Sequence, residues 1–79
     1  MRLSEVGVGA TVVVQSVAPG QGGLGRRLED LGFLAGTVVR VERRAPLGDP
    51  MVYELRGVRL AVRRADVALV EVTEVPDGS

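Results

Sequence analysis

The residues able to do chemistry are few in this chain, and their types argue against catalysis. There is no His and no Cys, so the commonest general base and the most reactive nucleophile are both absent. The Ser residues therefore have no imidazole to activate them. Glu29 and Asp30 are adjacent, and adjacent residues on a helix point in different directions, so they do not form a catalytic pair. We expect no catalytic site and predict that the protein is not an enzyme.

Metal binding would depend on carboxylates. Imidazole and carboxylate ligands both suit ferrous iron, and this chain offers only the second, together with Met thioethers and backbone carbonyls. The acidic side chains follow no spacing typical of a metal site, so solvated surface charge is the stronger interpretation of Glu29, Asp30, Asp49, Glu54, Asp66, Glu71 and Glu74. We predict no metal ligand set and no cofactor.

Composition excludes several further classes. A chain of 79 residues is enough for one domain. Its ten basic residues, all Arg, balance ten acidic ones, whereas nucleic-acid binders usually carry a basic excess. No apolar stretch approaches the roughly 18 residues of a membrane span, and the N-terminus lacks the apolar core of a signal peptide. We expect a cytoplasmic protein with no nucleic-acid partner and no membrane insertion.

Val-rich runs separated by Gly and Pro predict a β domain. The alternation of Met51, Tyr53 and Leu55 places these three side chains on one face of a strand. Gly57 then marks a tight hairpin. We expect five strands, at residues 10–17, 37–43, 51–56, 58–63 and 69–73.

One helix interrupts the strands. Leu24, Leu28 and Leu31 stand at i, i+4 and i+7, which is one face of a helix. Gly32 is well placed to end it in a left-handed conformation. The Gly-rich stretch before the helix lacks the Lys-Ser/Thr ending of a P-loop, so we interpret it as a connector. Residues 64–68 suit a single helical turn.

The predicted fold class is all-β with one short helix. Five short strands would leave exposed edges in an open sheet, and closing the sheet removes them. We therefore predict a small SH3-like β-barrel over residues 1–74, followed by a disordered C-terminal tail at residues 75–79.

Several segments, taken in order, resemble the FeoA domain. They are Leu3–Glu5, Arg27–Thr37, Ala45–Pro50 and Arg56–Arg63, followed by Ala65. The resemblance covers the chain from Leu3 to about Val72, and the order and spacing of the segments make it specific. The family usually has Pro at the positions of Val8 and Ala35; these departures loosen turns and remove no chemistry.

The resemblance implies a cytosolic SH3-like barrel that assists the ferrous-iron transporter FeoB by binding its cytosolic GTPase portion. It also implies an alternative, because the same barrel is appended to metal-dependent repressors. In that alternative the chain is a stand-alone regulatory domain that contacts such a repressor, or associates with its own copies, with transition-metal binding. Association with iron rests on the resemblance alone. The sequence leaves the oligomeric state open.

A partner-binding surface is the best functional hypothesis. Apolar residues on connectors near the helix would make an interface patch if exposed together, and Arg is favoured at interface hot spots. Closure of the barrel by the apolar residues, and solvated charge for the Arg residues, are the alternatives. The candidate residues are Arg26, Arg27, Phe33, Leu34, Leu47, Met51 and Arg63.

Overall fold

The computed structural model describes residues 1–75. Each predicted strand is present, with bounds within a residue of those expected, and the helix has the expected bounds. Residues 76–79 of the predicted tail lie outside the described residues. In chain order the elements are the 3-10 helix η1 (Leu3–Glu5), β1 (Thr11–Val17), α1 (Leu24–Leu31), β2 (Val38–Arg44), β3 (Met51–Leu55), β4 (Val58–Val62), α2 (Arg64–Val67) and β5 (Val70–Glu74).

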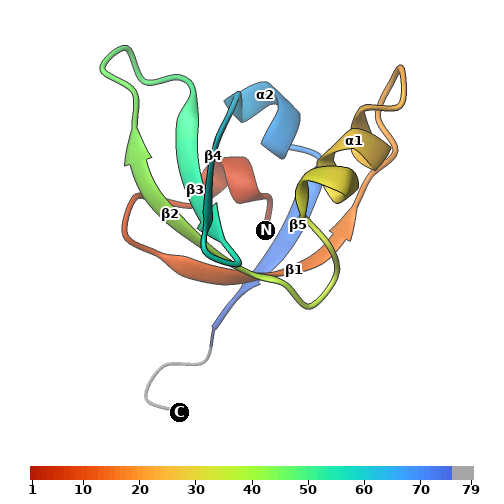
Figure 1. Cartoon of the computed structure of the whole chain (residues 1–79), viewed down its shortest axis with the longest axis horizontal. Coiled ribbons are helices and arrows are strands. Elements are labelled where there is room, and N and C mark those ends of the chain that lie inside the picture. Colours follow the sequence, from red (N-terminus) through yellow and green to blue (C-terminus); the bar gives the residue numbers. More distant parts are fainter. Residues whose placement is uncertain (76–79) are drawn as a thin grey trace.

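All five strands form one antiparallel sheet in the order β4-β3-β2-β1-β5. The sheet curls strongly, so that β1 and β2 form the floor of a half-closed barrel (Figure 1). Register shifts between Val14 and Ser16 in β1, and between Val41 and Arg43 in β2, mark the bends. An extra residue at such a point increases the local twist of the strand and lets a small sheet close.

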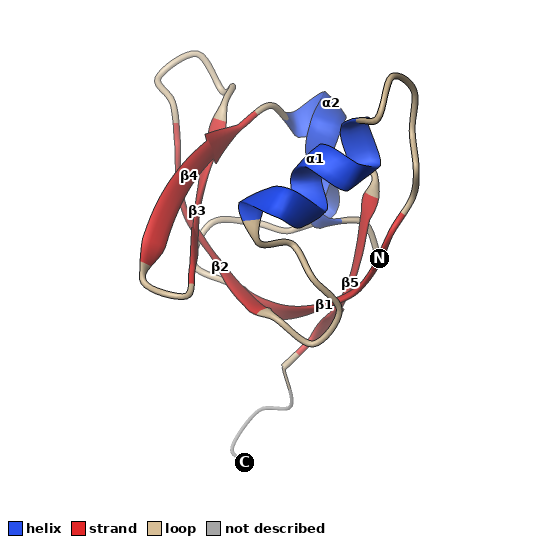
Figure 2. Cartoon of the chain, turned by 45° about the vertical axis from the view of Figure 1, so that its right-hand side comes forward, coloured by secondary structure: helices blue, strands red, loops and turns tan. Residues whose placement is uncertain are grey.

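The edge strand β5 is covered by the first residues of the chain. On the outer side of β5, Arg2 forms an isolated bridge with Glu71, and the N–H of Val72 donates to the carbonyl of Met1 at 2.7 Å. Residues 1–2 therefore cover that edge. The helices α1 and α2 lie over the concave side of the sheet, between its two ends (Figure 2).

The core is largely aliphatic, and Val supplies most of it. Val12 and Val14 of β1 are buried, as are Val39 and Val41 of β2, because alternate side chains of a strand face the same side. The only two aromatic rings, Phe33 and Tyr53, meet edge to face with their centroids 6.2 Å apart. This is a favoured geometry for an aromatic pair.

Glycine sets the end of α1. Gly32 has φ 122°, its N–H donates to the carbonyl of Glu29, and the N–H of Phe33 donates to the carbonyl of Leu28 at 3.1 Å. The last bond and the positive φ are those of a Schellman-type helix end, in which the residue after the glycine packs back against the helix. The turn therefore directs the Phe33 ring into the core.

Candidate partner-binding surface

The start of α1 is fixed against the end of β1. The N–H of Gly25 donates to the carbonyl of Pro19 at 2.9 Å, and the N–H of Ala18 donates to the carbonyl of Leu69 at 2.8 Å. Gly25 is buried so closely that a Cβ there would lie 2.2 Å from the carbonyl oxygen of Ala18. A glycine at this position lets the helix backbone touch the backbone of the preceding connector.

Because of this close approach, α1 presents Gly25 and Leu28 to the barrel, and its C-terminal end is more exposed to solvent. Leu28 is buried, but Leu31 is 46% exposed. Leu24, Leu28 and Leu31 lie on one face of the helix as predicted, but that face is not buried along its whole length. Leu34, two residues beyond the helix-ending glycine, is 40% exposed, and its N–H donates to the carbonyl of Gly32 at 2.8 Å.

The β3–β4 hairpin supplies the other side of the same surface. A Cβ on Gly32 would lie 3.0 Å from a methyl carbon of Leu55, and Leu55 pairs across the hairpin with Val58. Val58 is 52% exposed and Leu60 is half-buried. We define the α1–β4 surface as Leu31, Leu34, Val58 and Leu60.

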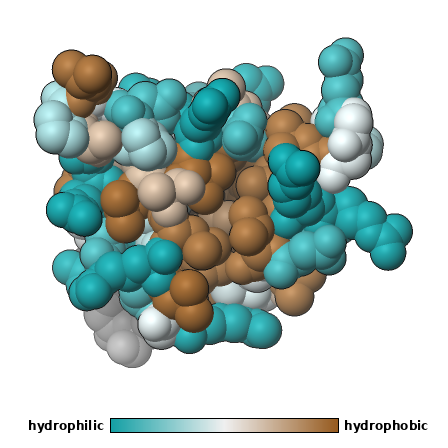
Figure 3. Space-filling view, turned by 45° about the horizontal axis from the view of Figure 1, so that its top comes forward, coloured by the Kyte–Doolittle hydropathy of each residue, from teal (hydrophilic) through white to brown (hydrophobic). Residues whose placement is uncertain are grey.

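Hydrophobic side chains also gather when the protein is viewed from the side of the helices. They form a continuous area edged by hydrophilic residues (Figure 3). An apolar area with a polar rim is typical of a protein interaction site. Sequence reasoning misses Leu31, Val58 and Leu60 because their spacing is that of core-facing positions. Gly25, a glycine inside the helix, is the sequence signal that could have indicated close packing on that side and hence the exposure of Leu31.

The structure does not bring all the predicted site residues together. Arg26 and Arg27 are exposed on α1, and Arg63 is exposed just after β4. Leu47 is 97% exposed in the β2–β3 loop. Leu34 precedes β2 and Leu47 follows it, and a strand of seven residues is roughly 20 Å long. The two Leu residues therefore lie at opposite ends of β2 and form no common patch.

Two of the predicted partner-binding residues belong to the core. Phe33 is 0% exposed and Met51 is 3% exposed. Phe33 is directed inward by the helix-ending turn, and Met51 shares the inward face of β3 with Tyr53 and Leu55. Their assignment to a partner surface is wrong. Both side chains instead help to fill the barrel core.

The Leu47 end of the barrel is closed by polar contacts. A carboxylate oxygen of Asp49 accepts from the N–H of Arg64 at 3.0 Å, and an Nη of Arg64 donates to the carbonyl of Ser4 at 3.3 Å. Burial raises the pKa of Tyr53 to about 12, an effect that Arg64 opposes and Asp49 reinforces. Tyr53 therefore stays neutral and supplies no acid–base chemistry near pH 7.

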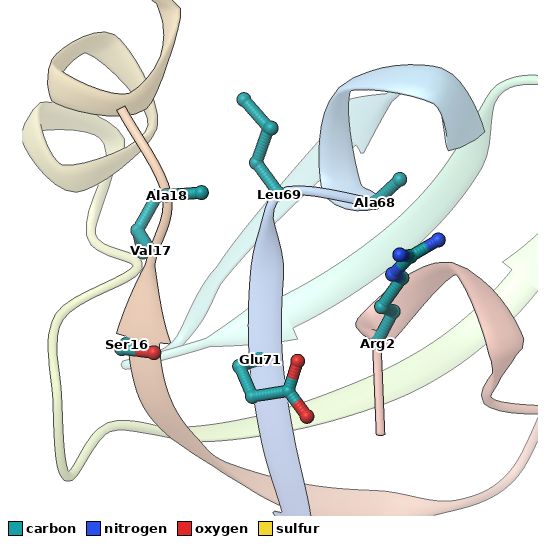
Figure 4. A pocket seen from close by; sticks show the side chains of 7 residues that line it. All are labelled: Arg2, Ser16, Val17, Ala18, Ala68, Leu69 and Glu71. Carbon is teal, nitrogen blue, oxygen red and sulfur yellow. The ribbon is translucent and has the colours of Figure 1, made fainter. Parts of the chain in front are cut away.

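A hollow of about 540 Å³ lies on another side of the molecule, between the ends of β1 and β5 and the first residues of the chain (Figure 4). Ser16 lines it, but no His is present to activate the hydroxyl. Glu71 also lines it and accepts a hydrogen bond from the amino group of Met1. The other lining residues are Arg2, Val17, Ala18, Ala68 and Leu69.

Across residues 1–75, no group of three or more His, Cys, Asp or Glu side chains is placed to hold a metal ion. In the same part of the chain, no helix has the length and apolar character needed to cross a membrane.

Comparison with known proteins gives consistent matches. The family model described as the FeoA domain matches residues 1–74. A curated relative from Porphyromonas gingivalis, named Fe(2+) transport protein A/Fe(2+) transporter FeoB fusion protein, is 38% identical over 72 residues. That match covers 91% of this chain but only 8% of the fusion protein.

Solved structures agree over the whole fold. The FeoA protein of Chlorobium tepidum is 37% identical, with a TM-score of 0.86, and the match covers 100% of this chain and 74% of that one. FeoA of Stenotrophomonas maltophilia, complexed with zinc and described as a prokaryotic SH3 domain protein, is 33% identical with a TM-score of 0.81, over 92% of this chain and 89% of that one. The predicted SH3-like barrel is confirmed, and the chain belongs to the FeoA domain family.

Proposed function

We propose that this protein is a non-enzymatic accessory factor of bacterial ferrous iron transport. In this role it binds and modulates the cytosolic GTPase portion of a FeoB-type transporter. The proposal requires a cytoplasmic location, which is where that portion of the transporter lies. It assigns no resident metal to the chain, and iron is the cargo of the transporter.

The proposal rests on an exposed apolar surface of this protein, considered together with a relative in which the matching domain is fused to a transporter. The α1–β4 surface exposes Leu31, Leu34 and Val58 by 46%, 40% and 52%, which favours a protein partner. In the Porphyromonas gingivalis relative, the matching domain and a FeoB transporter share one polypeptide. Domains fused in one protein are often bound to one another when they occur in separate chains, and this favours a FeoB-type partner.

The charged residues of α1 support contact beside this surface. Arg26 and Arg27 are exposed on the same helix as Leu31, and Arg is enriched among the residues that contribute most to binding at protein interfaces. Leu47 and Arg63 lie toward the other end of the barrel, so we propose them as a separate contact and not as part of the α1–β4 surface.

Calorimetric titration against the cytosolic portion of the FeoB-type transporter of the same organism tests the proposal. We expect saturable heat with that portion and none in a parallel titration with Fe(II) alone. We expect a Leu31→Asp, Leu34→Asp variant to bind at least ~10-fold more weakly, because two apolar contacts become buried carboxylates. Saturable binding of Fe(II) without binding of the transporter portion would refute the proposal.

A further inference from the structure

The strand β4 is the uncovered end of the sheet. In the order β4-β3-β2-β1-β5, the other end, β5, is covered by residues 1–2 through the bridge between Arg2 and Glu71. Among the described residues, no strand or bridge lies on the outer side of β4. In Figure 2, β4 forms the outer side of the fold beside β3. An uncovered edge offers unpaired backbone donors and acceptors to another chain.

The register of the hairpin shows which backbone groups are free. Leu55 and Val58 close the two-residue turn, and the β3–β4 pairing continues without a shift to Met51 and Val62. In a hairpin of this type the closing pair exchanges both hydrogen bonds, and every second pair after it does the same. The intervening residues of β4, Arg59 and Ala61, therefore direct their N–H and carbonyl groups away from β3.

The side chains beside this edge are apolar. Val58 and Leu60 alternate with Arg59 and Ala61 along β4, so their side chains lie on the same face of the strand, as part of the α1–β4 surface. Val58 is 52% exposed, and Leu31, another residue of the α1–β4 surface, is 46% exposed. A strand added beside β4 would place its own alternate side chains against these residues.

The outer strand and its flanks are rich in Arg, and the carboxylate of Glu54, just before the turn, accepts a hydrogen bond from the N–H of Gly57 at 3.1 Å. Residues 55–65 contain four Arg and no acidic residue. Arg59 forms an ion pair with Glu42 at 2.9 Å. Within residues 1–75, neither Arg56 nor Arg63 lies within ion-pair distance of a carboxylate. These two Arg residues flank the strand and favour acidic groups at both ends of whatever binds there.

From these observations we infer that β4 accepts an extended segment of the partner protein as an additional strand. The segment alternates apolar residues along its middle and carries acidic residues at both ends. Backbone pairing with Arg59 and Ala61 supplies affinity, and the α1–β4 surface selects the apolar side chains. A second copy of this chain fits less well, because pairing β4 with itself would bring the Arg-rich flanks of the two copies together and offer no acidic residue from β4 to Arg56 or Arg63.

Only the identity of the partner rests on the proposed function; the mode of binding rests on the edge itself. The first probe is a short synthetic peptide of alternating Val and Thr with paired Glu at each end. The second is the cytosolic portion of the transporter. On binding, we expect hydrogen exchange at the amides of Arg59 and Ala61 to slow at least ~10-fold, because both become hydrogen-bonded. A peptide with Lys in place of Glu should not bind.

Two variants isolate the edge. Ala61→Pro removes an outward N–H, and proline is tolerated on an edge strand where that group faces solvent. We expect at least ~10-fold weaker binding of both probes, whereas Ala61→Val keeps the donor and should bind both. Should Ala61→Pro fail to fold, Arg56→Glu with Arg63→Glu tests the charges. We expect that pair of changes to weaken binding by ~10-fold or more, with Arg43→Glu, two strands from the edge, as its control.

The outcomes separate this inference from the proposed function. If the transporter portion binds the wild type and Ala61→Pro equally, with no protection at Arg59 and Ala61, strand addition is wrong and the proposed function stands. If the acidic peptide binds with that protection but the transporter portion does not bind, the proposed partner is wrong and the edge site stands. Self-association that slows exchange at the same amides in the free protein would overturn the choice of an acidic segment.

Discussion

A carboxylate oxygen of Asp49 lies 3.0 Å from the backbone nitrogen of Arg64, which donates a hydrogen bond to it. This contact joins the β2–β3 loop to the first turn of α2. The first N–H groups of a helix have no partner within the helix, so a side chain from another element here acts as a cap. Because the side chain of Arg64 also donates to the carbonyl of Ser4, three segments distant in sequence meet at this point.

Loss of this cap should lower stability. We expect Asp49→Ala to reduce the free energy of unfolding by about 1 kcal/mol, the usual value of a helix-capping contact. Asp49→Asn keeps a side-chain oxygen as acceptor and should cost less. Urea unfolding followed by circular dichroism measures both. Equal stability of wild type and Asp49→Ala would show that the contact contributes nothing in solution.

Close packing of Gly25 makes a second prediction. A Cβ there would lie 2.2 Å from the carbonyl oxygen of Ala18 and 2.8 Å from Cα of Pro19, so the helix must move away from the connector. We expect Gly25→Ala to cost about 2 kcal/mol in thermal or urea unfolding, despite the better helix propensity of Ala. Gly7→Ala is the matched control, because a Cβ at Gly7 meets no atom within 4 Å. Similar stabilities of the two variants would contradict the packing argument.

Tyr53 should make stability depend on alkaline pH. Burial raises its pKa from 10.0 to about 12, so the phenol ionises earlier in the unfolded chain than in the folded protein. The stabilisation is fully present below pH 10 and is lost as the pH rises through 12, a change of roughly 2 to 3 kcal/mol. The chain has no Lys and no Cys to titrate in the same range.

Tyr53→Phe provides the control for that pH profile. The hydroxyl of Tyr53 is buried with no hydrogen-bond partner among the described residues, so its removal should leave stability at pH 7 unchanged or slightly higher. The variant should also lose the alkaline decline between pH 10 and 12. A clear loss of stability at pH 7 would mean that the hydroxyl is hydrogen-bonded in solution.

Single substitutions should separate the two proposed contact regions, because Leu34 and Leu47 lie at opposite ends of β2. We expect Leu34→Asp to weaken binding of the transporter portion by ~10-fold or more, since Leu34 belongs to the proposed α1–β4 contact surface. Leu47→Asp should weaken it less, because Leu47 projects alone from a loop at 97% exposure. The reverse order of effects, measured by calorimetry, would move the main contact to the β2–β3 loop.

The strands and the helix could be predicted from the sequence because each has a strong local signal. Alternation identifies the buried face of β3, and Gly32 identifies the end of α1. The exposure of Leu31 could not be predicted in this way, since it depends on how α1 rolls against the backbone of Ala18 and Pro19. That roll is set by a tertiary contact of Gly25 and not by the spacing of the Leu residues.

In the candidate site too, some residues could be assigned from local sequence patterns, whereas others depend on tertiary structure. Leu34 and Phe33 are neighbours on one connector, yet one is exposed and the other is buried, because the helix-ending turn points them in opposite directions. For Met51, the alternation with Tyr53 and Leu55 already argues for the core. The free edge of β4 depends on strand order, which no local pattern specifies.

The strand β1 has a consequence for the order of folding. It pairs with β2 and also with β5, which lies at the other end of the described chain. The β2–β3 and β3–β4 pairings are between consecutive strands and close short loops, whereas β1–β5 must close almost the whole domain, and such closure is slow because its entropy cost comes before its contacts. We therefore expect the meander of β2, β3 and β4 to form first and the docking of β5 onto β1 to set the folding rate.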